Sequence, residues 1–172
     1  MSIKSHPKGL YVLFFTEAWE RFSYYGMRAL LVLYLVKHLN MARHNALEIY
    51  ALYTGLVYFT PMIGGYLADK YLGARKAIII GGLVMALGHL AMAFESLLYP
   101  ALGLLIVGNG FFKPNISTIV GGLYEEHDPR RDGGFTIFYM GINLGAFFSP
   151  LVCGTLGENY GWDWGFSAAG IG

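Results

Sequence analysis

The stretch LYVLFFTEAWERFSYYGMRALLVLYLV, residues 10–36, decides the fold class of this chain. It is long enough to cross a bilayer as a helix, because a span needs about 20 apolar residues. Within it, Glu17, Glu20 and Arg21 place three charges in five residues. Each charge costs at least about 2.5 kcal/mol at membrane depth. Helix packing does not require such a cluster, so we expect it to handle a charged solute or a proton.

The composition of the whole chain is that of an all-α polytopic membrane protein. Of its 172 residues, 55% are hydrophobic and 13% are charged, whereas a soluble domain carries about 25% charged residues. The 24 glycines suit closely packed membrane helices. The net charge of +1 predicts no nucleic-acid surface, and the single Cys153 predicts neither a disulfide nor a metal site. We therefore expect the lipid bilayer to be the solvent of this chain.

Six apolar segments predict six membrane helices separated by short polar links. They cover about residues 10–36, 47–68, 77–94, 101–123, 135–156 and 164–172. The sixth is too short to span, so residues 1–172 are expected to be an N-terminal transmembrane bundle whose C-terminal partner bundle is missing. Seven Lys and Arg lie in the tail (Lys4, Lys8) and in the second and fourth links, against two in the others. This asymmetry predicts a cytoplasmic N-terminus.

The charges of the first segment share one helical face. A rotation of 100° per residue places Glu17, Glu20, Arg21 and Arg28 on a face about 100° wide, with Tyr25 on its edge. Glu17 and Arg21 are spaced i,i+4 and are expected to pair, which leaves Glu20 in need of another partner. The alternative is an ion pair that only locks helices together.

Lys113 lies in the middle of the fourth segment, within GFFKPN at residues 110–115. Pairing with Glu17 or Glu20 would keep its ammonium charged, and Pro114 removes one helical hydrogen bond beside it. Interrupted helices near the midplane are common in transporter binding sites. A kinked helix with a snorkelling lysine is the alternative, and Lys113 is too deep for it.

Three further polar residues lie in the fifth and third segments. Tyr139 and Asn143, spaced i,i+4, share one face. The Asn143 amide could hold an ammonium or an amide group, or could simply form a hydrogen bond between helices. His89 could relay protons, although a neutral packing histidine is the favoured interpretation.

The link after the second segment, GYLADKYLGARK at residues 65–76, is a second specific feature. It resembles the loop between the second and third helices of the major facilitator superfamily. The resemblance implies a cytoplasmic gating loop that uses Gly65, Asp69, Gly73 and Arg75. Plain positive-inside anchoring is the alternative.

Three motifs together resemble the proton-dependent oligopeptide transporters, a family within that superfamily. They are Glu17-x-x-Glu20-Arg21 with FSYYG after it, FKPNIS at residues 112–117, and FTIFYMGINLGA at residues 135–146. The likeness extends over essentially the whole chain. It implies the N-terminal six-helix bundle of a two-bundle fold, with the sixth helix truncated. It also implies a protein of the cell membrane, not an enzyme, that imports di- and tripeptides by alternating access.

The resemblance implies a role for each matching residue. Arg21, Tyr25 and Lys113 would receive the carboxylate of the peptide, and Asn143 would hold its amino end or backbone. Tyr58 and Tyr139 would line the cavity. Glu17, Glu20, Arg21 and Lys113 would form a salt-bridge switch that couples proton and peptide binding. Protons are the coupling ion, and no other cofactor is implied.

The sequence departs from the family pattern at one position and leaves other functions open. The second-segment histidine of animal members is replaced by Ala51, so proton coupling would rest on carboxylates. The basic pocket alone would equally serve a relative that moves nitrate or a carboxylate metabolite. An intramembrane enzyme or photoreceptor with a Lys113 Schiff base lacks a second catalytic group. A structural scaffold would not explain the charged face.

Overall fold

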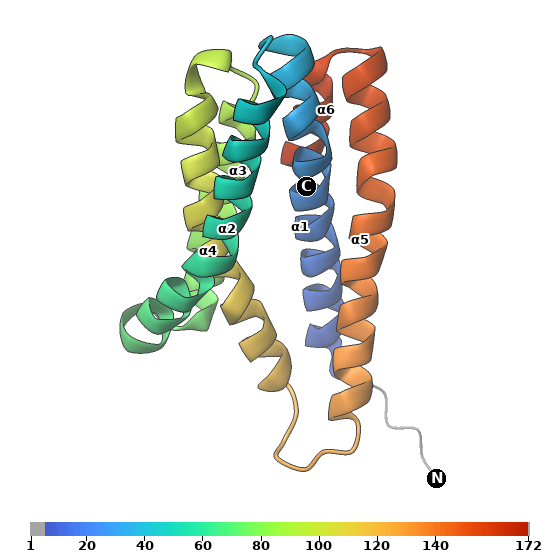
Figure 1. The fold of residues 1–172 in the computed structure, drawn as a ribbon. Helices are drawn as coiled ribbons and strands as arrows, with labels where there is room; N and C mark the ends of the chain where they lie inside the picture. Colours follow the sequence, from blue (N-terminus) through green and yellow to red (C-terminus); the bar gives the residue numbers. More distant parts are fainter. Residues whose placement is uncertain (1–5, 172) are drawn as a thin grey trace.

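In a computed structural model, the chain forms the predicted bundle of six helices (Figure 1). The structure describes residues 6–171, so Lys4 of the predicted tail and Gly172 of the sixth predicted segment lie outside the described residues. The helices are α1 (Lys8–Leu33), α2 (Arg43–Leu67), α3 (Ala74–Ala91), α4 (Leu98–Gly121), α5 (Arg131–Asn159) and α6 (Trp162–Ile171). Short turns of π-helix extend α1 over Tyr34–His38 and α2 over Ala68–Leu72, and a 3₁₀ turn at Glu95–Leu97 precedes α4.

Helices α2 and α5 begin before the apolar segments that predicted them. They start at Arg43 and Arg131, ahead of predicted starts at residues 47 and 135. Hydropathy locates only the part of a helix inside the hydrocarbon, whereas the backbone hydrogen bonds continue into the polar interface. At the other end, Gly73 stops α2: its φ of 77° is left-handed, and its N–H donates to the Ala68 carbonyl at 2.7 Å.

Four helical stretches are long and apolar enough to cross a membrane: Arg43–Leu72, Ala74–Ala91, Glu95–Gly121 and Arg131–Asn159. α1 has a comparable length of 26 residues but carries the charged residues between Glu17 and Arg28. Large apolar side chains remain exposed on the bundle, including Met62 at 71% and Val12 at 66%. The fold is therefore that of a multi-pass membrane protein, whose outer face is solvated by lipid.

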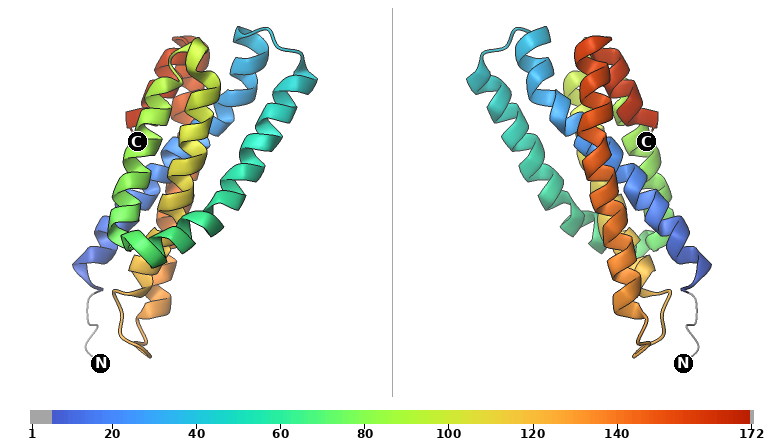
Figure 2. Two further views of the ribbon diagram at one scale, coloured as in Figure 1. Left: turned by 90° about the vertical axis from the view of Figure 1, so that its left-hand side faces the viewer. Right: turned by 90° about the vertical axis from the view of Figure 1, so that its right-hand side faces the viewer.

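The helices pack as two groups of three. α1, α5 and α6 form one group, and α2, α3 and α4 form the other (Figures 1 and 2). The groups meet where α3 contacts α6, where α4 contacts α1 and α5, and where α1 contacts α2. The charged face of α1 therefore lies where polar groups from α4 can reach it.

A stripe of small residues on α5 allows α1 to approach closely. Gly141 and Gly145 lie against the backbone carbonyls of Phe14 and Ala18. One turn further along, the Ser149 hydroxyl donates to the Phe22 carbonyl at 2.6 Å. Small residues spaced by four let membrane helices pack backbone to backbone. This contact fixes the turn of α1 that carries Glu20 and Arg21.

Helix α4 is held in the same way between α2 and α3. Gly108 packs against Gly81 of α3, and Gly110 packs against Gly64 of α2. Pro114 has no N–H to donate to the Gly110 carbonyl, and that carbonyl lies directly against Gly64. The backbone of α4 is thus fixed on both sides of Asn109, one turn before Lys113.

Candidate functional site

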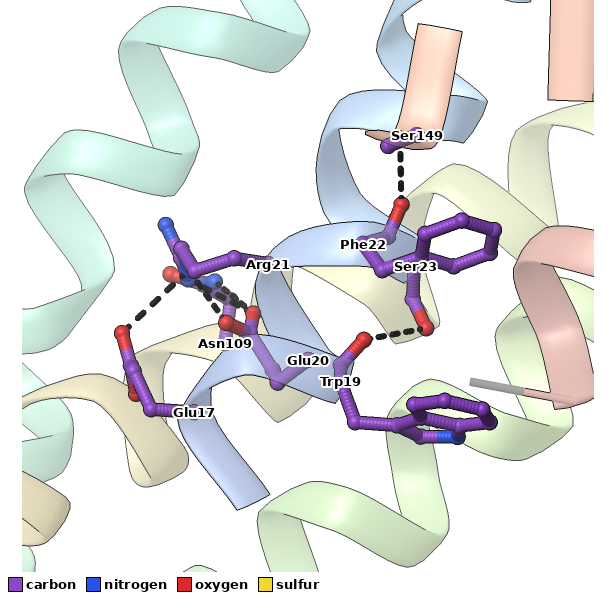
Figure 3. A network of polar contacts seen from close by, with 8 residues as sticks. All are labelled: Glu17, Trp19, Glu20, Arg21, Phe22, Ser23, Asn109 and Ser149. Atoms are coloured by element: carbon purple, nitrogen blue, oxygen red, sulfur yellow. Dashed lines mark hydrogen bonds and ion pairs between the residues drawn. The ribbon is translucent and has the colours of Figure 1, made fainter. Parts of the chain in front are cut away.

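The charged face of α1 is buried inside the bundle. Glu17, Glu20 and Arg21 have exposed fractions of 2%, 6% and 2%. The Arg21 guanidinium donates to both oxygens of Glu20, from Nε to Oε2 and from Nη2 to Oε1, the latter at 2.6 Å. Its Nε lies 3.4 Å from Glu17 Oε1. Figure 3 shows both carboxylates directed at the one guanidinium.

This arrangement contains the predicted ion pair between Glu17 and Arg21 and adds a contact that the spacing did not predict. The sequence analysis left Glu20 in need of another partner, whereas the fork of Arg21 also engages Glu20, with two hydrogen bonds. An arginine side chain is long enough to fold back on its neighbour, and bidentate contacts are the strong ones. Glu17 Oε2 has no hydrogen-bond partner among the described residues. Glu17 is therefore the less satisfied of the two acids.

Asn109 of α4 is a site residue that the sequence analysis missed. It is 2% exposed, and its Nδ2 donates to Glu20 Oε1 at 3.3 Å (Figure 3). The available signal was its position within the otherwise apolar run 101–112 and four residues before Lys113, which places both on one face. Asn109 joins α4 to the charged face of α1.

Lys113 does not form the predicted ion pair in this structure. Among the described residues, no carboxylate lies within ion-pair distance of it; its Nζ instead lies 5.3 Å from the centroid of the Tyr58 ring. Electrostatic interaction with Glu17, Glu20 and Arg21 nevertheless reaches this half-buried ammonium. A cation over an aromatic face is held without being neutralised. Lys113 is therefore available to an anionic ligand.

The predicted lining residues lie toward the surface of the bundle. Tyr58 and Tyr139 are 59% and 55% exposed, and Asn143 is exposed on the same face of α5 as Tyr139. Tyr25 is half-buried and packs edge-on against Tyr24, with 5.1 Å between ring centroids. These side chains are free to contact a ligand, in contrast to Glu17 and Glu20.

Arg28 is the second cation on the charged face of α1. Its Nε donates to the Tyr50 hydroxyl of α2, and its guanidinium lies 5.3 Å and 6.0 Å from the ring centroids of Tyr50 and Tyr24. The sequence analysis placed Arg28 on the charged face but assigned it no role. Tyr24 lies four residues before Arg28 on α1, whereas Tyr50 belongs to α2, which only the tertiary structure brings near.

The loop residues lie apart from this cluster, whereas His89 lines a cavity together with Glu20. Gly65 packs beside Pro114, whereas Asp69 and Arg75 are exposed, and neither forms an ion pair within residues 6–171. His89 is 4% exposed and packs against Gly170 of α6. That burial agrees with a packing histidine.

The helical bundle and its buried charge cluster define a class, the N-terminal six-helix bundle of a major facilitator-type membrane transporter. A sequence profile described as PTR2, POT family, matches residues 75–172. The chain belongs to this family of transporters.

Relatives and solved structures agree with that assignment. The chain is 49% identical over 97% of its length to the uncharacterized transporter YclF of Bacillus subtilis, covering 36% of that protein. It is 48% identical over 96% of its length to a di-/tripeptide transporter of Lactococcus lactis, covering 35% of it. The crystal structure of a peptide transporter POT in complex with sulfate matches 99% of the chain at 48% identity with a TM-score of 0.94, over 36% of that structure. A POT family transporter in complex with 5-aminolevulinic acid matches 99% at 39% identity with a TM-score of 0.93, over 37% of that structure. The chain thus spans about a third of the length of the relatives it matches.

Proposed function

We propose that this chain forms the N-terminal half of the pathway of a proton-coupled di- and tripeptide importer that works by alternating access. The observation that carries the proposal is the buried Arg21 held by Glu20 and Glu17, with Lys113 of α4 in electrostatic reach. A cation whose partners are internal acids can exchange them for an external carboxylate. Such an exchange links the ligand to the protonation of the acids.

The proposed cycle begins when a peptide carboxylate binds between Arg21 and Lys113. Arg21 then shares its donors with the peptide, and Glu20 loses part of the contact that stabilises its charge. Glu20 takes up a proton from water in the cavity, because an ionised carboxylate without a cation is costly at this depth. Peptide and proton then occupy the site together, which couples uptake to the proton gradient.

Peptides are the proposed substrates because the site offers more than a cation. Tyr25, Tyr58, Tyr139 and Asn143 provide hydroxyl and amide groups for a peptide backbone. Two relatives whose names state a substrate are di-/tripeptide transporters. The amino end of the peptide would meet acids of the C-terminal bundle that completes the cavity.

The orientation and the gating loop are part of the proposal. The excess of Lys and Arg in the tail and in the second and fourth links supports a cytoplasmic N-terminus in the cell membrane. Gly65, Asp69, Gly73 and Arg75 would then lie on the cytoplasmic side, where the exposed charges can pair with the other bundle during closure.

The test is uptake of a labelled dipeptide into proteoliposomes that contain the full-length transporter, under an imposed proton gradient. K113A is expected to abolish uptake, and E20Q to abolish gradient-driven uptake while leaving counterflow exchange. K37A is the control, because Lys37 pairs with Glu158 on the exposed surface and such pairs contribute little. Full uptake by K113A, or gradient-driven uptake of labelled nitrate in place of the dipeptide, would overturn the proposal.

A further inference from the structure

Only one of the two polar atoms of the Asn109 amide forms a hydrogen bond with the described residues. Its Nδ2 donates to Glu20 Oε1 at 3.3 Å, whereas its Oδ1 is buried and has no hydrogen-bond partner among the described residues. A buried amide oxygen left without a donor has lost its hydrogen bonds to water without compensation, which is unfavourable. Since neighbouring helices hold Asn109 firmly, this cost points to a second state in which the oxygen is used.

The observed orientation fits one protonation state of Glu20. An ionised carboxylate only accepts hydrogen bonds, so the amide presents Nδ2 to it. A protonated carboxyl has an O–H to donate, and its match is the amide oxygen. Rotation of the side-chain amide by half a turn exchanges Nδ2 and Oδ1 with little change in shape. The same residue can therefore satisfy both forms of Glu20.

The backbone around Asn109 is fixed on both sides. Gly108 packs against α3 and Gly110 packs against α2, so α4 cannot easily withdraw the amide from Glu20. Asn109 also precedes Lys113 by one helical turn and shares its face. Asn109 can therefore form a different hydrogen bond with each protonation state of Glu20, and it lies on the same helix as Lys113, the proposed binding residue for the peptide carboxylate.

We infer that Asn109 is a positioning residue for proton exchange at Glu20. Its Nδ2–H donates a hydrogen bond to the ionised acid, and its Oδ1 accepts a hydrogen bond from the carboxyl O–H after Glu20 is protonated. The proton comes from hydronium in cavity water and forms one O–H bond at Glu20 Oε1, and the hydronium is left as water. The inference rests on the proposed function, in which Glu20 carries the proton.

Other titratable groups lie near Glu20, and every variant compared below retains them. On α1, the Arg21 guanidinium binds it directly, and the Glu17 carboxylate shares that guanidinium. From the other helices, the groups are Lys113 on α4, Tyr53 on α2 and His89 on α3, which lines a cavity of about 500 Å³ together with Glu20. Replacing Asn109 leaves all of them in place.

The test compares gradient-driven uptake with counterflow exchange in the full-length transporter. N109L fills a similar volume without hydrogen bonds, and we expect the ratio of gradient-driven uptake to counterflow to fall at least tenfold. N115L is the matched control, because the buried Asn115 amide on the same helix donates within α4, to the Phe111 carbonyl at 2.7 Å. Its ratio is expected to match the wild type.

N109D supplies a second readout if N109L fails to fold. A carboxyl group of the same shape beside Glu20 retains a proton on the pair to higher pH, so the pH midpoint of uptake is expected to rise by at least half a unit. An unchanged ratio in N109L, or an unchanged midpoint in N109D when N109L is unfolded, overturns this inference alone. A wild type without gradient-driven dipeptide uptake overturns the proposed function, and the inference with it.

Discussion

The close contact between α1 and α5 gives a quantitative prediction at Gly145. A Cβ added there would lie 2.9 Å from the Phe22 nitrogen and 3.0 Å from Arg21 Cβ, and closer still to the Ala18 carbonyl oxygen. Because carbon contacts are optimal at about 3.5–4.0 Å, G145A must push the helices apart by about 1 Å. Overpacking of this kind costs about 1–3 kcal/mol.

Gly154 on the same helix is the matched control, because a Cβ added there meets nothing within 4 Å. Both variants gain the same helix propensity, about 0.5–1 kcal/mol for alanine over glycine. The difference between them therefore isolates the overpacking, and G145A is expected to be about 1–3 kcal/mol less stable than G154A.

The assay is unfolding of the purified full-length transporter in detergent, followed by tryptophan fluorescence during heating and during titration with a denaturing detergent. G145A is expected to unfold at a lower temperature than the wild type, and G154A at the same or a higher temperature. Equal stability of the two variants would refute the argument that backbone contact with α1 excludes a side chain at Gly145.

Three further predictions use the same unfolding assay. G73A is expected to cost about 1–3 kcal/mol, because the φ of 77° disfavours any residue with a Cβ; G103A in open space should not be destabilised, and equal losses would contradict this reasoning. S149A is expected to cost about 0.5–1.5 kcal/mol through the lost hydrogen bond to the Phe22 carbonyl, and a variant as stable as the wild type would show that this bond contributes nothing. Burial raises the pKa of Tyr124, in the link between α4 and α5, above its ordinary value of 10.0. The contribution of this phenol to the free energy of unfolding should therefore be constant below about pH 10 and fall as the pH rises further. Y124F should lose less stability than the wild type as the pH rises above about 10. The same dependence of stability on pH in Y124F and the wild type would argue against the role of Tyr124.

The number of helices and their membrane location could be predicted from the sequence because hydropathy and helical period are local properties. The length of the apolar segment 10–36 predicted a membrane helix, and a rotation of 100° per residue predicted which of its residues share the charged face. The helix ends were harder to predict. α5 starts at Arg131 within a polar link, because hydrogen bonding continues where hydropathy has already fallen.

The full set of partners of the site residues depends on the tertiary structure. Spacing predicted the ion pair between Glu17 and Arg21, which is present at 3.4 Å, but not the two hydrogen bonds from the same guanidinium to Glu20. Lys113 was expected to meet an acid and instead lies over the ring of Tyr58. A long side chain can contact any polar group within its reach. Which group it contacts depends on how the helices cross, and the local sequence pattern does not predict that crossing.

The sequence alone thus determined that this protein buries charge in a membrane and which face of α1 carries it. The tertiary structure decided what that charge touches. Glycine contacts bring α5 against α1 and fix α4 between α2 and α3, and those contacts place Asn109 beside Glu20. The physical reason is that burial of a charge is a local cost visible in composition, whereas its compensation comes from residues distant in the chain.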